Sequence, residues 1–168
     1  MKTPKHHMAL CVGSFDPPSL GHFNIIERSL KIFDRVVVGI AKNYSKSTLF
    51  SIEERESLLK DIFKNEPRVE VACFEGLLVA YAKERGIKTL IRGIRTVEDY
   101  QYEFQMSLIN KSLDPDMETL FMMTEGSLSH VSSSMIKEVV ELGGSVTHMV
   151  HPLVEAKLKE KLIKRQTL

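Results

Sequence analysis

The chain has 168 residues, of which 23 are Lys or Arg and 22 are Asp or Glu, so its formal net charge is +1. Two cysteines cannot cross-link a chain of this length into a disulfide scaffold, and an apolar fraction of 43% excludes a disordered or collagen-like composition. The near-neutral charge argues against a nucleic-acid partner, which would require a basic surplus. The length predicts a single domain over residues 1–168, with a flexible N-terminus at residues 1–7.

The sequence contains no apolar run approaching the ~20 residues that span a bilayer, and no apolar signal segment follows the basic N-terminal residues. We therefore expect a cytoplasmic protein without a membrane partner. The pair His6 and His7 has no partner ligand near it in the sequence, and no other metal-ligand cluster is evident. We predict no metal site built from protein ligands.

Short apolar runs alternate with helical patterns along the chain. Continuous apolar runs, typical of strands buried on both faces, occupy residues 8–12, 35–41, 69–74, 89–92 and 118–123. Helical patterns occupy residues 24–33, 51–63, 77–85, 97–112, 132–142 and 152–164, and Ser51 with Glu54 forms a capping box. This alternation predicts an α/β fold with a Rossmann-like, doubly wound, five-stranded parallel sheet, helices on both faces and a C-terminal helix.

The C-terminal helix carries an apolar stripe of Val154, Leu158 and Leu162 beside basic residues at 157–165. This spacing favours an amphipathic helix that packs on the sheet and exposes a solvated basic face. A contact of the basic face with a membrane or an acidic partner is the alternative.

Open parallel sheets bind ligands at the carboxyl ends of their strands, so the residues that follow the strands are the candidate binding residues. A turn-rich loop at residues 13–21 follows the first strand and leads to His22 in the first turn of a helix. The loop is neither a phosphate-binding Walker A loop nor a dinucleotide-binding glycine motif. Its backbone N–H groups suit an anion, and His22 could donate a hydrogen bond to a phosphate. A surface or capping histidine is the alternative.

Further hydrogen-bond donors follow the other strands. Lys46 lies in the polar loop after the second strand, where a solvated lysine is the simpler reading. Arg92 ends an apolar strand and requires an anion, Gly93 would let backbone approach a ligand, and Arg95 follows. The serines at 132–134 exceed what helix capping needs. These donors predict a phosphorylated ligand, such as a nucleotide, at the strand ends.

The two cysteines and the acidic residues give weaker signals. Cys11 and Cys73 stand in apolar runs, which predicts buried small side chains, with a redox role for one of them as the alternative. No pair of neighbouring carboxylates resembles the site of a hydrolase.

Two segments resemble the signatures of the nucleotidylyltransferase superfamily. The first is Gly-Ser-Phe-Asp-Pro at 13–17 with Gly-His at 21–22, and the second is Val-Ser-Ser-Ser at 131–134 with Lys137. Leu-Ile-Arg-Gly-Ile-Arg at 90–95, Asp-Tyr-Gln-Tyr-Glu at 99–103, Asn110 and Phe-Ser-Ile-Glu-Glu-Arg at 50–55 resemble, more narrowly, the bacterial phosphopantetheine adenylyltransferases. The similarity extends over residues 9–162.

This resemblance implies a role for each matching residue. It implies that His22, Lys46 and Arg95 are catalytic. It implies that phosphopantetheine is bound by Ser14, Lys46, Leu78 and Arg92. It implies that ATP is bound by Ser14, Phe15, His22, Gly93, Ile94, Arg95, Glu103, Leu128, Ser129, His130, Val131, Ser132, Ser133 and Ser134.

The resemblance also implies an enzyme that transfers AMP from ATP to 4′-phosphopantetheine, giving dephospho-coenzyme A and pyrophosphate by in-line attack without a covalent intermediate. Mg²⁺ would act with ATP, the assembly would be a cytoplasmic homohexamer, and coenzyme A is a candidate feedback ligand. Two alternatives stay open: another small-molecule nucleotidylyltransferase, such as a nicotinamide mononucleotide adenylyltransferase, and a non-catalytic nucleotide-binding domain.

The sequence departs from the family pattern at several positions. Ser14 replaces the usual Thr, and Ser19 stands where the signature has His or Thr, so both positions keep a polar side chain. Cys11 stands where relatives often have Tyr, and His130 stands where they often have an aromatic ring.

Overall fold

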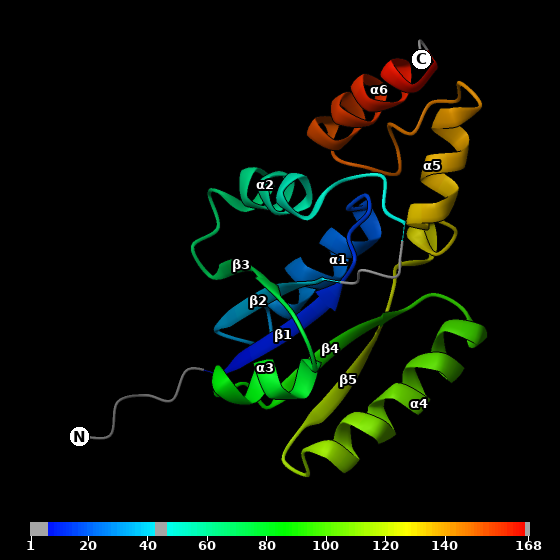
Figure 1. Cartoon of the computed structure of the whole chain (residues 1–168). Helices are drawn as coiled ribbons and strands as arrows, with labels where there is room; N and C mark the ends of the chain where they lie inside the picture. The colour runs from blue at the N-terminus through cyan, green and yellow to red at the C-terminus, as the bar shows by residue number, and fades with distance from the viewer. Residues whose placement is uncertain (1–6, 43–46, 167–168) are drawn as a thin grey trace.

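A five-stranded parallel sheet forms the centre of the molecule (Figure 1). The computed structural model describes residues 7–42 and 47–166, with side chains through residue 162. The strands are β1 (Met8–Gly13), β2 (Arg35–Ala41), β3 (Val69–Phe74), β4 (Thr89–Ile94) and β5 (Glu118–Met123). They pair in parallel in the order β3-β2-β1-β4-β5, so the chain moves outward from β1 in one direction and then in the other. The predicted doubly wound α/β fold is confirmed.

Helices cover both faces of this sheet. They are α1 (Leu20–Ser29), α2 (Ile52–Phe63), α3 (Leu78–Glu84), α4 (Val97–Leu113), α5 (Ser133–Glu141) and α6 (Pro152–Gln166), with a short 3-10 helix η1 at Gly126–Leu128. Helices α1 and α2 lie on one face, and α3 and α4 lie on the other (Figure 1). The expected capping box starts α2, because Ser51 accepts from the Glu54 N–H and Glu54 accepts from the Ser51 N–H.

The central strands bury side chains on both sides, as their continuous apolar runs predict. Along β1, Ala9 and Cys11 face the core under α1 and α2, whereas Leu10 faces the core under α3. The edge strand β5 differs from this expectation, because Leu120 is 37% exposed and Met123 is 62% exposed. Buried strands and edge strands share the same residue types, so periodicity does not separate them.

Two element boundaries differ from those predicted. Helix α1 spans Leu20–Ser29 instead of residues 24–33, because Ser19 caps it and the imidazole of His22 completes the capping box in place of the usual Glu or Gln. Strand β4 continues through Gly93 to Ile94, since these residues still pair with β5. The spacing of apolar residues predicts neither the Ser19–His22 cap nor the pairing of Gly93 and Ile94 with β5.

A separate core lies beside the sheet and joins α2, α5 and α6. The stripe of Val154, Leu158 and Leu162 is buried there, together with Val131, Ile136 and Phe50. The stripe prediction is confirmed, but the expectation that α6 packs on the sheet is wrong, since α6 contacts α5 and α2. Figure 1 shows α5 and α6 set apart from the strands.

Residues 1–6 of the predicted flexible N-terminus lie outside the described residues, and His7 is the first residue that the structure describes. Its N–H donates to the Asp34 carboxylate at 2.9 Å, and its carbonyl accepts from the Asp34 N–H at 3.0 Å. Within 7–42 and 47–166, no helix has the length and apolarity required to cross a membrane.

The second core should carry a measurable part of the stability. Leu158 is fully buried, so Leu158→Ala should lower the free energy of unfolding by about 2–4 kcal/mol through lost burial and a residual cavity. Urea unfolding measures this change. Leu153→Ala on the same helix is the control, because Leu153 is 45% exposed and its loss should cost under ~1 kcal/mol. Equal effects of the two substitutions would contradict the packing of α6.

Candidate active site

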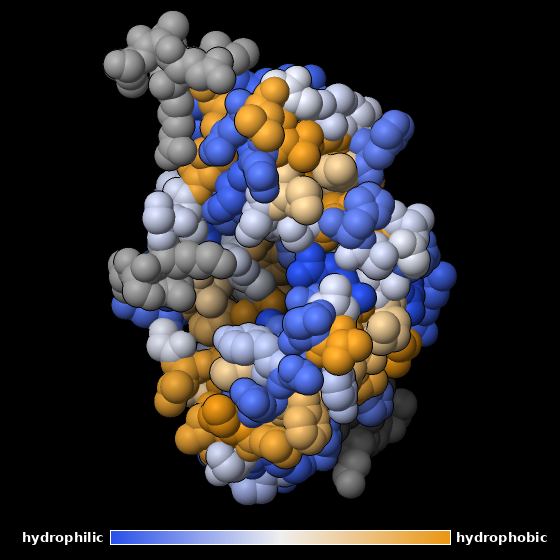
Figure 2. All heavy atoms as spheres, turned by 90° about the vertical axis from the view of Figure 1, so that its right-hand side faces the viewer, coloured by the Kyte–Doolittle hydropathy of each residue, from blue (hydrophilic) through white to orange (hydrophobic). Residues whose placement is uncertain are grey.

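A cavity of about 310 Å³ opens at the carboxyl ends of β1 and β4. Figure 2 shows the surface hollowed between the part of the molecule that carries α5 and the part that carries α4. Many residues singled out from the sequence line this one cavity: Ser14, Phe15, His22, Arg92, Gly93, Arg95, Glu103, Val131, Ser132, Ser133 and Ser134. The strand ends therefore bring the predicted donors together.

Other candidate residues lie elsewhere. Leu78 begins α3 and packs against the core between α3 and the sheet. Ile94 is buried and does not line the cavity. Residues 128–130 precede the lining residues, with Leu128 packed against the second core, Ser129 bonded to the Gly126 carbonyl, and His130 exposed. Lys46 lies outside the described residues. The roles of all six stay predictions.

The ring of His22 is held in one orientation by the turn before it. Its Nδ1 accepts a hydrogen bond from the backbone N–H of Ser19 at 3.0 Å and lies 3.0 Å from the Ser19 hydroxyl. Phe15 packs edge-on against the ring, with 5.0 Å between the ring centroids. Because Nδ1 is an acceptor here, the neutral ring carries its proton on Nε2, where it can donate to a ligand.

The electrostatic surroundings keep His22 neutral. Burial, together with the positive charges of Arg95 and Arg92, lowers the pKa of His22 from 6.5 to about 4. At neutral pH this side chain therefore supplies a directional N–H donor and no charge. Sequence position alone left capping and ligand binding as alternatives for His22, and the structure shows a capping histidine that also lines the cavity.

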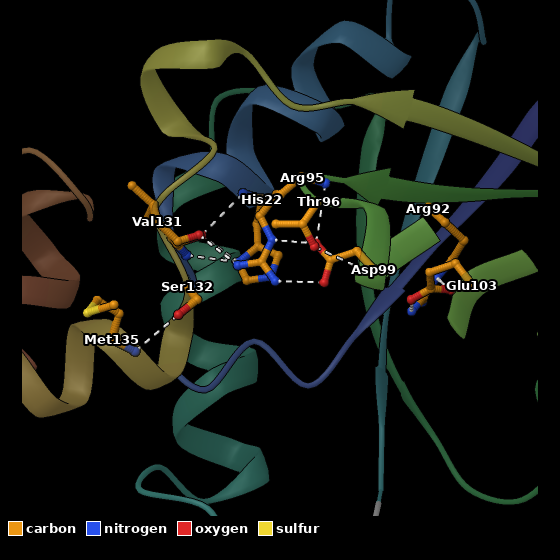
Figure 3. A network of polar contacts seen from close by, with 10 residues as sticks. His22, Arg92, Arg95, Thr96, Asp99, Glu103, Val131, Ser132 and Met135 are labelled. Atoms are coloured by element: carbon orange, nitrogen blue, oxygen red, sulfur yellow. Dashed lines mark hydrogen bonds and ion pairs between the residues drawn. The ribbon is translucent and has the colours of Figure 1, made fainter. Parts of the chain in front are cut away.

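Two arginines reach the cavity from β4 and the residue after it, and each is held by a carboxylate of α4 (Figure 3). Arg92 forms two bonds with Glu103, one from Nε to Oε2 at 2.6 Å and one from Nη2 to Oε1, and its Nη1 donates to the Val12 carbonyl at 2.6 Å. Arg95 donates from Nε and Nη2 to Asp99 at 2.9 and 3.1 Å, and its Nη1 donates to the Val131 carbonyl at 3.0 Å.

These bonds leave binding capacity on both guanidinium groups. A guanidinium has five N–H donors, and each arginine uses three of them in the bonds just described. With respect to residues 7–42 and 47–166, two donors on each side chain remain for a ligand. Asp99 and Glu103 are one helical turn apart, so the same face of α4 orients both arginines. Glu103 was predicted to contact ATP, and what the structure shows is its ion pair with Arg92.

The N-terminus of α5 forms the opposite wall of the cavity. Ser132 caps the helix by accepting from the Met135 N–H at 3.1 Å, and Ser133 donates to the Pro17 carbonyl at 2.9 Å. Ser134 lines the cavity and is exposed. Ser132 is thus the cap and Ser133 a tie to the first loop, whereas the hydroxyl of Ser134 has no partner among the described residues. The N–H groups at the start of a helix suit an anion.

Several residues that shape the site were missed from the sequence. Arg55 is 5% exposed and donates to the Ser14 carbonyl at 2.7 Å, and Asp16 is 3% exposed with three hydrogen-bond donors around it. Both lie inside quoted family segments, yet a single sequence does not show which charges are buried. Asp99 was quoted only as part of a segment, although its spacing to Arg95 is that of a helical ion pair.

Two glycines allow close packing around the cavity. A Cβ on Gly13 would lie 3.1 Å from the Phe15 ring, whose residue adopts a positive φ of 49°. A Cβ on Gly93 would lie 3.0 Å from Cγ1 of Ile25 on α1. Gly93 lines the cavity as expected, and its lack of a side chain also lets β4 approach α1 closely.

The thiol of Cys11 lies against the floor of the cavity and is 7% exposed. Burial raises its pKa to about 11, with Arg92 opposing the shift, so the thiol is protonated at neutral pH. Cys73 is only half-buried, which corrects the expectation that both cysteines are buried.

Comparison with known proteins agrees with the resemblance in the sequence. Residues 10–139 match the family model described as Cytidylyltransferase-like. A phosphopantetheine adenylyltransferase of Clostridium tetani is 52% identical over 144 residues, covering 86% of this chain and 90% of that protein. Proteins of the same name from Caldanaerobacter subterraneus subsp. tengcongensis and Geotalea daltonii are 45% and 46% identical, and cover 94% and 92% of this chain and 98% and 96% of their own lengths.

A solved structure also shares the fold. It is a protein of Vibrio parahaemolyticus provisionally designated a nicotinate-nucleotide adenylyltransferase, with a TM-score of 0.69 and 20% sequence identity. The match covers 94% of this chain and 95% of that protein. At this identity the likeness concerns the fold alone.

The depressed pKa of His22 predicts a specific dependence of stability on pH. A histidine in the unfolded chain titrates near 6.5, so between pH 6.5 and about 4 the unfolded state binds a proton that the folded state does not. His22 should therefore lower the free energy of unfolding as the pH falls through this window, and leave it unchanged above it. Urea unfolding of the wild type and His22→Gln should give parallel curves above pH 7 that converge toward pH 4. Curves that stay parallel throughout would contradict a neutral His22 with a lowered pKa.

Proposed function

This chain belongs to the phosphopantetheine adenylyltransferase family of cytidylyltransferase-like proteins, and from that membership we propose that it transfers AMP from ATP to 4′-phosphopantetheine. The products are dephospho-coenzyme A and pyrophosphate. The observation that supports this function best is the cavity in which the free donors of Arg92 and Arg95 meet His22 and the N-terminus of α5. That donor set suits two phosphorylated ligands side by side.

The proposed chemistry needs positioning more than proton transfer. A phosphate monoester has a second pKa of ~6, so the attacking oxygen of phosphopantetheine is already ionised at neutral pH and requires no general base. Both carboxylates that line the cavity, Asp99 and Glu103, are committed to arginines, in keeping with a reaction that lacks a carboxylate base. The nucleophilic oxygen attacks the α-phosphorus in line, and pyrophosphate leaves.

The donors divide between the two substrates in this proposal. Arg92, with Lys46 from the loop after β2, holds the phosphate of phosphopantetheine and so offsets its repulsion from ATP. Arg95 and His22 hold the triphosphate, and the Nε2–H of His22 donates to an oxygen on which charge increases in the transition state. Ser14 and the start of α5 complete the phosphate site. Leu78 and residues 128–130 are assigned to the pantetheine arm and the adenosine by the family pattern.

We propose Mg²⁺ as the metal that accompanies ATP. Among residues 7–42 and 47–166, no group of three or more His, Cys, Asp or Glu side chains is placed to hold a metal ion. Mg²⁺ commonly binds through substrate phosphates and few protein ligands, and the triphosphate of ATP would supply such phosphates in the cavity. When bound, the ion would offset charge on the pyrophosphate. We propose that the reaction takes place in the cytoplasm.

Release of pyrophosphate tests the function directly. The wild type should release it with ATP and 4′-phosphopantetheine, and not with nicotinamide mononucleotide or after Mg²⁺ is chelated. Added coenzyme A should inhibit, because it carries both the pantetheine arm and an adenine nucleotide. His22→Ala should lower kcat by about 10²–10³-fold, the scale of one lost transition-state donor. His148→Ala is the control, since His148 is exposed and lies outside the cavity. Unchanged turnover in His22→Ala would remove His22 from the mechanism.

We further propose that copies of the chain self-associate into a hexamer. Exposed apolar side chains gather on α4 and β5: Val97, Tyr100, Tyr102, Phe104, Leu108, Ile109, Leu113, Leu120 and Met123. Figure 2 shows hydrophobic residues concentrated over the part of the surface that carries α4. An extended apolar surface of this kind marks a protein–protein contact, which supports association through α4.

Charge placed on this surface should prevent association. Leu108 is 55% exposed, so Leu108→Glu should leave the fold intact and shift the sedimentation coefficient from that of a hexamer toward that of a monomer. Ile32→Glu is the matched control, because Ile32 is 58% exposed and lies in the turn after α1. A monomeric wild type, or a hexameric Leu108→Glu variant, would refute association through α4.

A further inference from the structure

The carboxylate of Asp16 joins three segments that are distant in the sequence. Its Oδ2 accepts from the Leu49 N–H at 2.9 Å and from Nζ of Lys137 at 3.0 Å, and its Oδ1 accepts from the Phe50 N–H at 2.8 Å. Asp16 is 3% exposed and does not line the active-site cavity. All the partners of this carboxylate named here are groups of the protein. Asp16 directly follows Phe15 in the loop after β1.

The partner Lys137 also directs its charge away from the cavity. It belongs to the second family signature, where a basic residue beside three serines suggests a ligand contact. Its ammonium group instead pairs with Asp16, and its side chain is 24% exposed. Lys137 lies one helical turn after Ser133 and Ser134, so its position determines where the start of α5 sits relative to the first loop.

A second bond connects the same two segments next to the ion pair. The Ser133 hydroxyl donates to the carbonyl of Pro17, the residue after Asp16. On the other side, Leu49 and Phe50 immediately precede Ser51, the N-cap of α2. Asp16 therefore holds the entry to α2 and the start of α5 at fixed distances from the loop that carries Ser14 and leads to His22.

We propose that Asp16 and Lys137 form a positioning pair that fixes the spacing between the two phosphate-binding walls of the cavity, namely the loop from Ser14 to His22 and the N-terminus of α5. The pair contacts no substrate and acts through the backbone on either side of it. A buried charge that loses its partner is strongly unfavourable, so these segments move apart or rearrange when either member is neutralised. This inference rests on the proposed adenylyl transfer, because the spacing matters for an extended triphosphate.

Paired substitutions separate positioning from direct contact. Lys137→Met should lower kcat by about 10–100-fold, the scale of a displacement near 1 Å, with a smaller change in KM for ATP. Lys137→Arg keeps the ion pair and should restore kcat to within about threefold. Lys159→Met is the control, because Lys159 is 57% exposed in its ion pair with Glu155 on α6 and its substitution should have no effect. Equal kcat values for Lys137→Met and Lys159→Met would overturn the proposal.

A double-mutant cycle with Asp16→Asn tests the pairing itself. A carboxylate does not attract a triphosphate, so a loss of kcat in Asp16→Asn similar to that in Lys137→Met, without an additive loss in the double variant, supports one positioning unit. Additive losses would assign Lys137 a direct contact and overturn the proposal. If Asp16→Asn does not fold, the comparison of Lys137→Met with Lys137→Arg decides.

Calorimetric titration with ATP alone keeps this proposal distinct from the proposed function. If the wild type released no pyrophosphate, adenylyl transfer would be refuted, yet Lys137→Met should still weaken ATP binding at least fivefold relative to Lys159→Met. Equal ATP affinities of these two variants, in a wild type that lacks transfer activity, would overturn the positioning pair.

Discussion

Two positive charges at the end of one strand impose the main constraint on this molecule. Arg92 and Arg95 both reach the cavity from the end of β4, where two unscreened cations would repel each other and lose hydration. Helix α4 resolves this by presenting Glu103 and Asp99 one turn apart, and the Val12 and Val131 carbonyls each accept one further bond. The direction of each guanidinium is thereby fixed before any ligand arrives, which is the form of preorganisation that phosphoryl chemistry uses.

The walls around these arginines depend on packing elsewhere. The first loop is buried from Phe15 to Ser19, and it turns the His22 ring through the Ser19 cap. The start of α5 rests on the second core, which in turn depends on α2 and α6. Ile62 of α2 packs against both this core and the core that α1 and α2 form with the sheet, so α2 connects the two.

Sequence reasoning was strongest where local rules decide the structure. The alternation of apolar runs and helical patterns predicted the sheet and its helices, and Ser51 with Glu54 predicted the start of α2. The convergence of donors on one cavity followed from the topology alone. The predicted ends of two elements were wrong, because they depend on contacts that apolar spacing does not show. The imidazole of His22 caps α1, and Gly93 and Ile94 pair with β5. The sequence analysis did not identify the structural roles of Asp16, Arg55 and Asp99. Those roles depend on burial and on hydrogen-bond partners that only the folded structure shows.

The pairing of each arginine with a carboxylate has a consequence for how ligands are captured. Arg92, Arg95, Asp99 and Glu103 sum to zero charge, and His22 is neutral at physiological pH. This cluster therefore creates little long-range field, and it does not draw anions toward the opening by diffusion-steering forces. These residues therefore recognise a ligand only at hydrogen-bonding distance, where the shape of the ligand and the direction of its acceptors decide whether it binds. Added salt should for that reason change the contribution of these residues to the association rate only slightly.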